Sequence, residues 1–294
     1  MSGIENEACA NCGKEASDAV KLKNCTACRL VKYCSVDCQK THRKKHKKAC
    51  KQRAAELKDE RLFSQGQEHA EEDFCPICTL PIPLPINKHS ARMVCCMKRI
   101  CYGCDVAAQE RGMHDCLFCR TPLPRDGASA LALVRKRVDA KDPEAIKSLG
   151  DNYSYGECGL EKNIPRAVDL WKEAAALGSS GAHYSLGSHY YVGEEVTQDK
   201  AKAVHHWENA AMKGNVLARC NLGNHEYNNN RNCERAVKHW LIAAKMGDKL
   251  ALDNIKAVFA NGNATKEQYA EALKGYQDSV DEMKSPERDV AKAL

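Results

Sequence analysis

Residues 180–214 read SGAHYSLGSHYYVGEEVTQDKAKAVHHWENAAMKG, and the chain repeats this plan on either side of them. Each copy carries a Leu-Gly pair, then a Trp, an Ala-Ala pair and a closing Gly. The three copies are Leu149-Gly150, Trp171, Ala174-Ala175 and Gly178; Leu186-Gly187, Trp207, Ala210-Ala211 and Gly214; and Leu222-Gly223, Trp240, Ala243-Ala244 and Gly247. The period is 36 or 37 residues and shortens once to 33. Self-similarity at such a period predicts an array of stacked units.

Each unit is predicted to be a helical hairpin. Apolar residues recur at every fourth position in both halves of the quoted stretch, at Ala182, Leu186 and Tyr190 and again at Ala203, Trp207 and Ala211. Residues four apart share one face of an α-helix, so each half can bury a face. The closing Gly suits a left-handed helix cap, and the small Ala residues let neighbouring helices approach closely.

This pattern resembles the Sel-one-like repeat, a relative of the tetratricopeptide repeat, over residues 142–283. The resemblance implies an all-α solenoid with a concave surface for protein partners. A fourth, degenerate unit over residues 248–280 lacks the Leu-Gly and Trp signals. We expect it to be an end cap, because the last hairpin of an array has one face against solvent.

The cysteines lie almost entirely ahead of the repeats. Fifteen of the eighteen fall between Cys9 and Cys119. The first residues have neither the basic start nor the apolar segment of a secretion signal, so we expect a cytoplasmic or nuclear protein. Thiols stay reduced in those compartments, where C-x₂-C pairs usually bind metal. No apolar run approaches the length of a membrane span, so we expect no membrane as a partner.

The first cysteine-rich segment holds eight potential ligands for two tetrahedral zinc ions. They are Cys9, Cys12, Cys25, Cys28, Cys34, Cys38, His46 and Cys50. A pair of cysteines separated by two residues supplies half a tetrahedron, so a second pair must complete each site.

The stretches Tyr33–Gln39 and His46–Cys50 resemble the MYND finger. The resemblance implies an interleaved arrangement, with one zinc on Cys9, Cys12, Cys34 and Cys38 and the other on Cys25, Cys28, His46 and Cys50. It also implies that the finger holds a short proline-containing peptide. One departure from the family is Arg43, which stands where Trp is common.

The second cysteine-rich segment also holds eight potential ligands, for one or two zinc ions. They are Cys75, Cys78, Cys95, Cys96, Cys101, Cys104, Cys116 and Cys119. The spacing resembles a RING finger, whose cross-brace would join Cys75, Cys78, Cys101 and Cys104 around one ion and Cys96, Cys116 and Cys119 around the other.

The fourth ligand of that second ion is open, because Lys98 stands where the RING pattern has His and a protonated Lys has no lone pair. We expect Cys95 to take its place, with His89 and His114 as alternatives.

Two functions fit these modules. The first is a non-enzymatic adaptor, with no catalytic residues, that binds partner proteins or peptides. The alternative is a RING-type ubiquitin ligase with a ubiquitin-conjugating enzyme as a partner and the solenoid as substrate-binding domain. Ile77 and Arg120 match the positions that contact that enzyme in active RING fingers, whereas Leu117 replaces a usual Pro. A RING-like fold does not by itself imply ligase activity, so we favour the adaptor.

The formal charge of +6 does not indicate nucleic-acid binding. Zinc ligands are thiolates, so three four-Cys sites and one mixed site would remove about seven charges and leave the chain near neutral. The basic run over residues 40–48 has no interleaved aromatic residue for base stacking, and we do not expect a nucleic-acid partner.

The expected organisation is a multi-domain chain, with small zinc-stabilised cross-brace fingers ahead of an all-α solenoid of helical hairpins. Its parts are a disordered N-terminus (1–8), a MYND-like finger (9–50), a charged helical linker (51–72), a RING-like module (73–124), a linker (125–141), the repeat solenoid (142–283) and a C-terminal tail (284–294).

Overall fold

The computed structural model describes residues 8–293. Of the disordered N-terminus expected over residues 1–8, residues 1–7 lie outside the described residues, whereas Ala8 forms an antiparallel bridge with Glu15. Two compact units are present, and they meet between Ser64 and Gln65. None of the helices in the described range is both long and apolar enough to span a bilayer.

The first unit is a small finger followed by a long helix. Its strands β1 (Lys23–Asn24) and β2 (Lys32–Tyr33) pair antiparallel, and α1 spans Val36–Ser64. The core consists of Tyr33 and cysteines, with few other apolar side chains around it. So small a core cannot support a fold without cross-links or metal.

Helix α1 continues through the basic run into the charged segment, where Arg53 pairs with Glu56 (3.1 Å) and Glu60 (2.7 Å). The helix expected over residues 51–72 stops at Ser64, before Gly66, whose φ of 62° is incompatible with a continuing α-helix.

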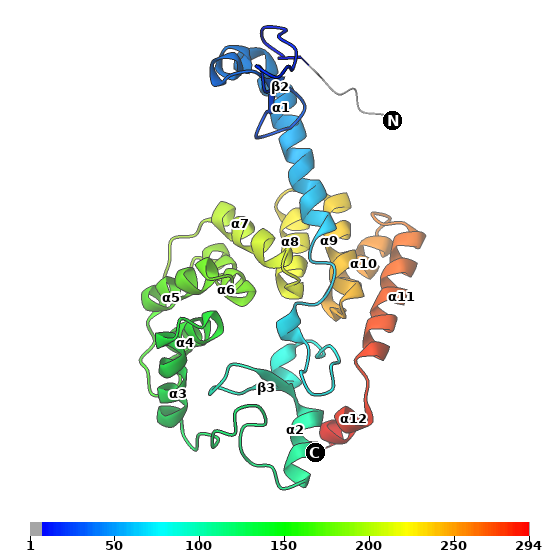
Figure 1. Ribbon diagram of the computed structural model, residues 1–294. Helices are drawn as coiled ribbons and strands as arrows, with labels where there is room; N and C mark the ends of the chain where they lie inside the picture. The colour runs from blue at the N-terminus through cyan, green and yellow to red at the C-terminus, as the bar shows by residue number, and fades with distance from the viewer. Residues whose placement is uncertain (1–7, 294) are drawn as a thin grey trace. The chain divides into compact units, whose positions relative to one another are not determined.

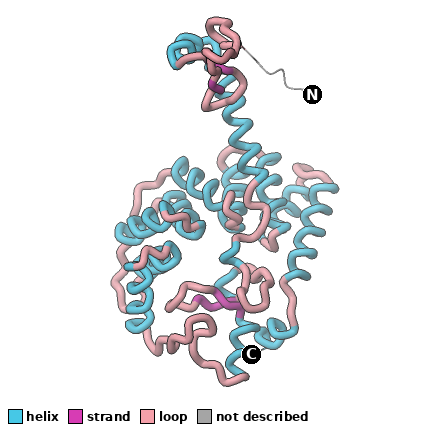
Figure 2. Tube along the Cα trace, in the orientation of Figure 1, coloured by secondary structure: helices cyan, strands magenta, loops and turns pink. Residues whose placement is uncertain are grey.

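The second unit begins with the other cysteine-rich segment. Its elements are η1 (Glu71–Asp73), η2 (Ile86–Lys88), β3 (Ser90–Arg92), β4 (Arg99–Cys101) and α2 (Tyr102–Glu110). Strands β3 and β4 pair antiparallel with Ala91 opposite Ile100, and they are the strands visible in the lower part of Figure 2. Ile82, Met93 and Ile100 are buried among the cysteines.

The remainder of the unit is helical, which confirms the predicted all-α solenoid (Figure 1). The helices are α3 (Gly127–Asp139), α4 (Pro143–Tyr155), α5 (Ile164–Ala176), α6 (Ser180–Val192), α7 (Lys200–Ala211), α8 (Val216–Asn228), α9 (Cys233–Lys245), α10 (Lys249–Ala260), α11 (Lys266–Glu282) and α12 (Pro286–Ala293). The hairpins are α4–α5, α6–α7, α8–α9 and α10–α11, and consecutive hairpins pack on one another.

The recurring Leu-Gly and Trp signals have one physical cause. A Cβ atom added to Gly150, Gly187 or Gly223 would lie 2.7, 2.4 or 2.5 Å from an indole atom of Trp171, Trp207 or Trp240, respectively. The first helix of each hairpin therefore needs Gly where the Trp of the second helix packs against it. The closing glycines Gly178, Gly214 and Gly247 all have positive φ (107°, 84° and 85°), as the predicted caps require.

Two segments differ from the expected organisation. Residues 125–141, expected to be a linker, contain α3, which begins with a capping box between Asp126 and Ser129 and buries Leu131 and Val134 in the repeat core. Residues 284–294, expected to be a tail, contain α12, which packs on α2. The sequence signals that mark the repeats are absent from both helices.

Candidate metal centres and the surfaces around them

Four groups of four side chains bring their ligand atoms within 4.8 Å of one another. The eight candidate ligands of the first cysteine-rich segment and the eight of the second all belong to these groups. The groups are Cys9, Cys12, Cys34 and Cys38; Cys25, Cys28, His46 and Cys50; Cys75, Cys78, Cys101 and Cys104; and Cys95, Cys96, Cys116 and Cys119.

The geometry of each group fits a tetrahedral ion. With Zn–S bonds of about 2.3 Å, two sulfurs of a tetrahedron lie ~3.8 Å apart. The Sγ–Sγ distances are 3.5 Å for Cys12–Cys34, 3.8 Å for Cys78–Cys101 and 3.7 Å for Cys96–Cys116. A disulfide would need about 2.05 Å. Sulfur and imidazole donors in this number are those that zinc prefers.

His46 is the single nitrogen donor among the sixteen ligands. Its Nε2 lies 3.1 Å from Cys28 Sγ, and it projects from α1 with 8 % of the residue exposed. The ring stacks on that of His42, one helical turn earlier, whose Nδ1 lies 3.1 Å from the Tyr33 hydroxyl. This packing fixes the direction of the imidazole toward the three thiols.

Five of the cysteine turns share one backbone geometry. In each, the residue after the second cysteine has positive φ and donates its N–H to the carbonyl four residues earlier. These residues are Gly13, Arg29, Thr79, Met97 and Arg120, with N–O distances from 2.7 to 3.0 Å. The tight turn directs two side chains to the same point.

The turn that contains Cys95 and Cys96 has the same backbone shape but lacks the C-x₂-C spacing of the other four turns. Its hydrogen bond runs from Met97 to Met93, so Met93 holds the position that a cysteine holds in the other four turns. Cys95 instead reaches Cys119, with a Sγ–Sγ distance of 3.3 Å. Neither His89 nor His114 belongs to any of the four groups.

Lys98, which replaces the His of the RING pattern, points elsewhere. Its Nζ lies 5.1 Å from the centre of the Phe118 ring, at cation–π distance. Ile77 is 47 % exposed, and the exposed Arg120 contacts the Met113 sulfur at 3.9 Å.

The first unit also has a cavity of about 380 Å³ beside the group that contains His46. It is called the finger cavity below. It lies beside α1 and is lined by Gln39, Lys40, Arg43, Lys47 and Lys51 together with Tyr33, Ala27 and three of the metal-ligand side chains.

In the second unit, residues 65–72 form a strap across the N-terminal ends of two repeat helices, α8 and α6. Arg219 of α8 is fully buried and donates to the main-chain oxygens of Gln65 (2.6 Å) and Gly66 (3.3 Å). Farther along the strap, the Glu72 carboxylate accepts from the Ser180 hydroxyl at the start of α6 (2.6 Å). The strap thus passes the repeats in the reverse of their sequence order.

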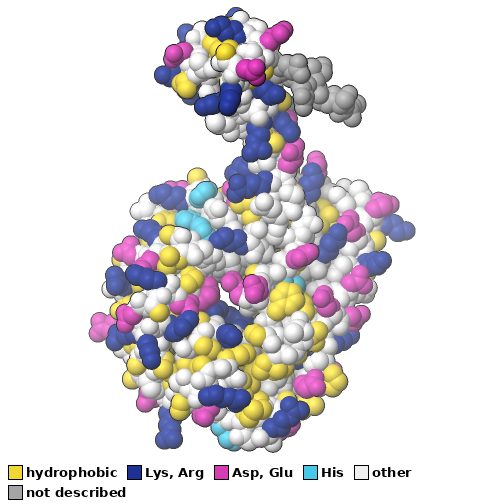
Figure 3. Space-filling view, in the orientation of Figure 1, with side chains coloured by type: hydrophobic (Ala, Val, Ile, Leu, Met, Phe, Trp, Pro, Cys, Tyr) yellow, Lys and Arg dark blue, Asp and Glu magenta, His cyan; other side chains and the backbone are white. Residues whose placement is uncertain are grey.

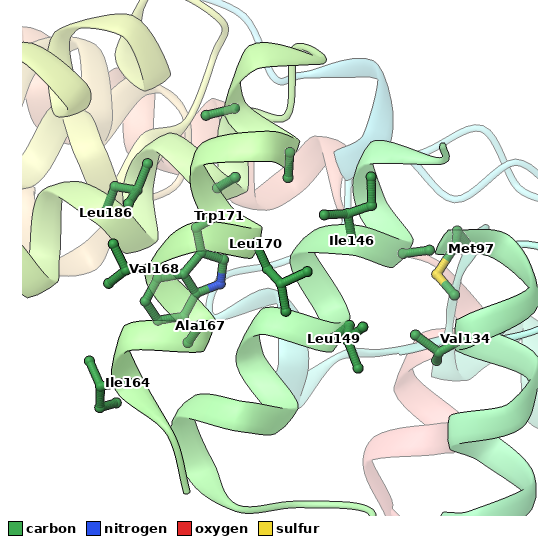
Figure 4. Close-up of a cluster of buried hydrophobic side chains, with 14 of the residues drawn as sticks. Met97, Val134, Ile146, Leu149, Ile164, Ala167, Val168, Leu170, Trp171 and Leu186 are labelled. Atoms are coloured by element: carbon green, nitrogen blue, oxygen red, sulfur yellow. The ribbon is translucent and has the colours of Figure 1, made fainter. Parts of the chain in front are cut away.

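The cysteine module that follows the strap also packs into the repeats. Arg92 pairs with Glu144 in the first turn of α4 (3.0 Å), and Met97 enters the core shared by α3 to α6 (Figure 4). Leu84 packs against the core of the later hairpins. In Figure 1 the helices α3 to α11 accordingly curve around β3 and α2.

The last helix, α12, also binds the cysteine module. Arg288 of α12 is 5 % exposed and donates to the main-chain oxygens of Pro81 (2.6 Å) and Leu80 (3.2 Å). Sequence reasoning missed Arg219 and Arg288, because their partners are backbone oxygens more than 150 positions away.

Comparison with known families agrees with this description. Residues 9–50 match the MYND finger, and residues 143–179, 180–215 and 217–248 each match the Sel1 repeat. The chain therefore carries one MYND finger and three Sel1 repeats, followed by a fourth hairpin of the same build.

Solved structures of Sel1 repeat proteins are similar to part of the chain. A Sel1 repeat protein from Oxalobacter formigenes is 24% identical with a TM-score of 0.48, and the match covers 61% of this chain and 71% of that one. The protective antigen c5321 of uropathogenic Escherichia coli, with an SLR fold, is 20% identical with a TM-score of 0.48, over 61% of this chain and 37% of that one. The immunity protein Pa5087 from Pseudomonas aeruginosa is 22% identical with a TM-score of 0.40, over 60% and 65% of the two chains.

The finger and the repeats together define the class of the protein. It is a zinc-binding module for protein–protein interaction.

Proposed function

We propose that the protein is a non-enzymatic adaptor that holds partner proteins or peptides on a zinc-stabilised framework. The observation that carries this proposal is the closure of all four groups of ligands, each with four sulfur or nitrogen donors. A zinc ion with four protein ligands has no open position for water or substrate. The ions would therefore stabilise the fold, two in the finger and two in the second cysteine module.

Metal analysis tests the framework. We expect about four zinc ions per chain, one for each closed group. Cys28→Ser should remove one ion from the finger and unfold it, because its small core depends on the metal. The helical circular-dichroism signal of the repeats should remain, since they lie in the other compact unit. A metal-free finger with unchanged amide chemical-shift dispersion would contradict the proposal.

In this proposal the finger cavity receives a peptide, and the repeats offer a separate protein surface. The inner N-terminal ends of α4, α6 and α8 already contact the strap and β3. At the opposite ends of α4 and α6, Tyr155 (71 % exposed) and Val192 (57 % exposed) occupy equivalent positions of consecutive repeats. Two aligned apolar side chains in solvent favour a partner surface there.

Partner capture from a lysate with the whole chain, compared with the double variant Tyr155→Ser and Val192→Ser, tests that surface. We expect the captured proteins to decrease in the variant while its melting temperature is kept, because exposed side chains contribute little to folding. A matched control is Leu177→Ser, which removes a 47 %-exposed apolar residue from the end of α5. Equal capture by all three chains would exclude the surface.

A ubiquitin ligase is the alternative, favoured by the exposure of Ile77 between the first two cysteines of the second module. If it holds, the whole chain should modify itself in an assay with ubiquitin-activating and ubiquitin-conjugating enzymes, and Ile77→Ala should abolish the activity with zinc content unchanged. Absence of modification across a panel of conjugating enzymes would leave the adaptor.

A further inference from the structure

The wall of the finger cavity is unusually cationic for a peptide groove. Lys40, Arg43, Lys47 and Lys51 line it, and their spacing of three, four and four residues places them on one face of α1. Among residues 8–293, which the structure describes, no acidic side chain lines the cavity.

These four cations have no ion-pair partner within the described part of the finger. Farther along α1, more than one turn beyond the basic run, Arg53 pairs with Glu56 and Glu60. Unpaired cations that converge on one concave surface create a positive potential that attracts an anionic group.

The negative charge of the zinc–thiolate groups does not cancel the positive charge of the finger. Residues 8–50 contain eleven Lys or Arg and three Asp or Glu, a formal charge of +8. Two ions bound to seven thiolates and one His would contribute −3, since 4 − 7 = −3, and leave the finger near +5. Figure 3 shows Lys and Arg side chains on the finger and along the helix that leaves it.

We propose that the finger cavity binds a short acidic segment of a partner protein, an inference that rests on the adaptor function proposed above. The Arg43 guanidinium in the cavity wall can hold a carboxylate through two hydrogen bonds. The amide nitrogen of Gln39 lies 3.9 Å from Cys25 Sγ, which leaves the amide oxygen to accept a main-chain N–H of the peptide.

A peptide fits these observations better than a nucleic acid. The aromatic residue of the cavity wall, Tyr33, is 3 % exposed and its hydroxyl lies beside His42, so its ring offers no platform for a base. Single-stranded nucleic acids depend on such stacking in addition to phosphate contacts.

Binding by fluorescence anisotropy on the whole zinc-loaded chain tests the inference. The probes are a labelled peptide with four consecutive Asp or Glu residues, a neutral proline-containing peptide of equal length, and a single-stranded oligonucleotide. The test variant is the double substitution Arg43→Glu and Lys47→Glu. The matched control is Lys44→Glu and Lys48→Glu, which makes the same change of charge on α1 outside the cavity wall. Zinc content checks that both variants are folded.

We expect the acidic peptide to bind more tightly than the neutral one, with an affinity that falls as salt rises. The cavity variant should weaken this binding about tenfold or more, because it removes charge-assisted hydrogen bonds to the peptide. The control should weaken it only slightly, because charges outside the cavity are screened by solvent and contribute little to the binding free energy.

Four results would overturn the inference. Equal weakening by both variants would mean bulk charge attraction, and tighter binding of the oligonucleotide would mean a nucleic-acid surface. Binding of the proline-containing peptide alone would leave the peptide adaptor standing with a different ligand. If neither peptide binds the loaded chain, the peptide-binding part of the proposed function fails as well.

Discussion

The Arg219 guanidinium donates to the main-chain oxygen of Gln65 across 154 positions of sequence, at 2.6 Å. It also donates to the carbonyl of Ala211 (2.9 Å), at the end of the preceding helix. Burial lowers the pKa of Arg219 to about 10, which still leaves the side chain charged at neutral pH. One buried cation therefore joins the strap to two repeat helices.

Removal of this cation should loosen the strap. Arg219→Ala leaves at least two carbonyl oxygens without their donor, and hydrogen bonds to a charged group contribute about 1.5–3 kcal/mol each. We expect a loss of ~3 kcal/mol in urea unfolding of the whole chain and faster proteolytic cleavage between residues 64 and 72. Arg135→Ala, at an exposed position of α3, is the control and should change neither measurement. Indistinguishable unfolding midpoints would show that Arg219 does not hold the strap.

The second repeat lacks a hydrogen bond that the first and third possess. Trp171 donates to Asp151 and Trp240 to Asn224, both at 3.0 Å, whereas the equivalent residue for Trp207 is Ser188. Trp207 Nε1 is buried and has no partner within the described structure. Ser188→Asn should supply an acceptor and stabilise the chain by about 1 kcal/mol.

Thermal and urea unfolding of Ser188→Asn beside Ser188→Ala checks this expectation. The alanine variant cannot provide an acceptor, so it should stay close to the parent. A lower midpoint for the asparagine variant would mean that the space beside Trp207 cannot accept the larger side chain.

Zinc content distinguishes the candidates for the sixteenth ligand. Cys95→Ser in the whole chain should lower the count by one ion, because its group is left with three cysteines. His89→Ala and His114→Ala should keep the full count. Full loading of the cysteine variant together with a loss in either histidine variant would refute the assignment of Cys95.

Acid should weaken the second hairpin through a pair of half-buried histidines. The Nδ1 atoms of His183 and His206 lie 3.0 Å apart between α6 and α7. Burial lowers the pKa of His183 to about 4, helped by the charges of His206 and Lys213, and burial also lowers the pKa of His206. An unfolded His titrates near ~6.5, so the unfolded chain binds protons first as the pH falls.

The stability contributed by the neutral pair should therefore be complete above about pH 6.5 and decline toward pH 4. Zinc release also destabilises the chain in acid, so the measurement is a difference. Between pH 7 and pH 5 the urea midpoint of the parent should fall more steeply than that of His183→Gln. Parallel curves would mean that the pair does not titrate on unfolding.

The hairpins could be predicted from the sequence because their signals are local. Apolar residues four apart define a helix face, and a Gly is needed wherever the Trp of the same hairpin packs. Helix α3 escaped prediction because it packs like a repeat helix without the Leu-Gly or Trp signal. The strap has no periodic pattern, and its position is set by Arg219 and Ser180, which lie far along the chain.

The grouping of the candidate ligand side chains agrees with what the resemblance to the MYND and RING patterns implies, with one limit. Spacing of two residues marks four of the five turns of common shape, but Met93 hides the fifth. The fifth turn is recognised only in the structure, from the positive φ of Met97, because Met has no preference for that backbone conformation. The adjacent cysteines are thus two side chains of an ordinary turn in which the ligand has moved from the first position to the third.

The strap has a consequence for how this protein can be divided for experiments. A recombinant fragment that starts with the repeats would lack the strap over α8 and α6, and the Arg219 guanidinium would lose the carbonyls of Gln65 and Gly66. Such bait would display a basic, freshly exposed edge that the intact chain conceals, and the proteins it captured would report on that artificial edge. A fragment meant to reveal native partners of the repeats has to begin no later than Gln65 and to include α12.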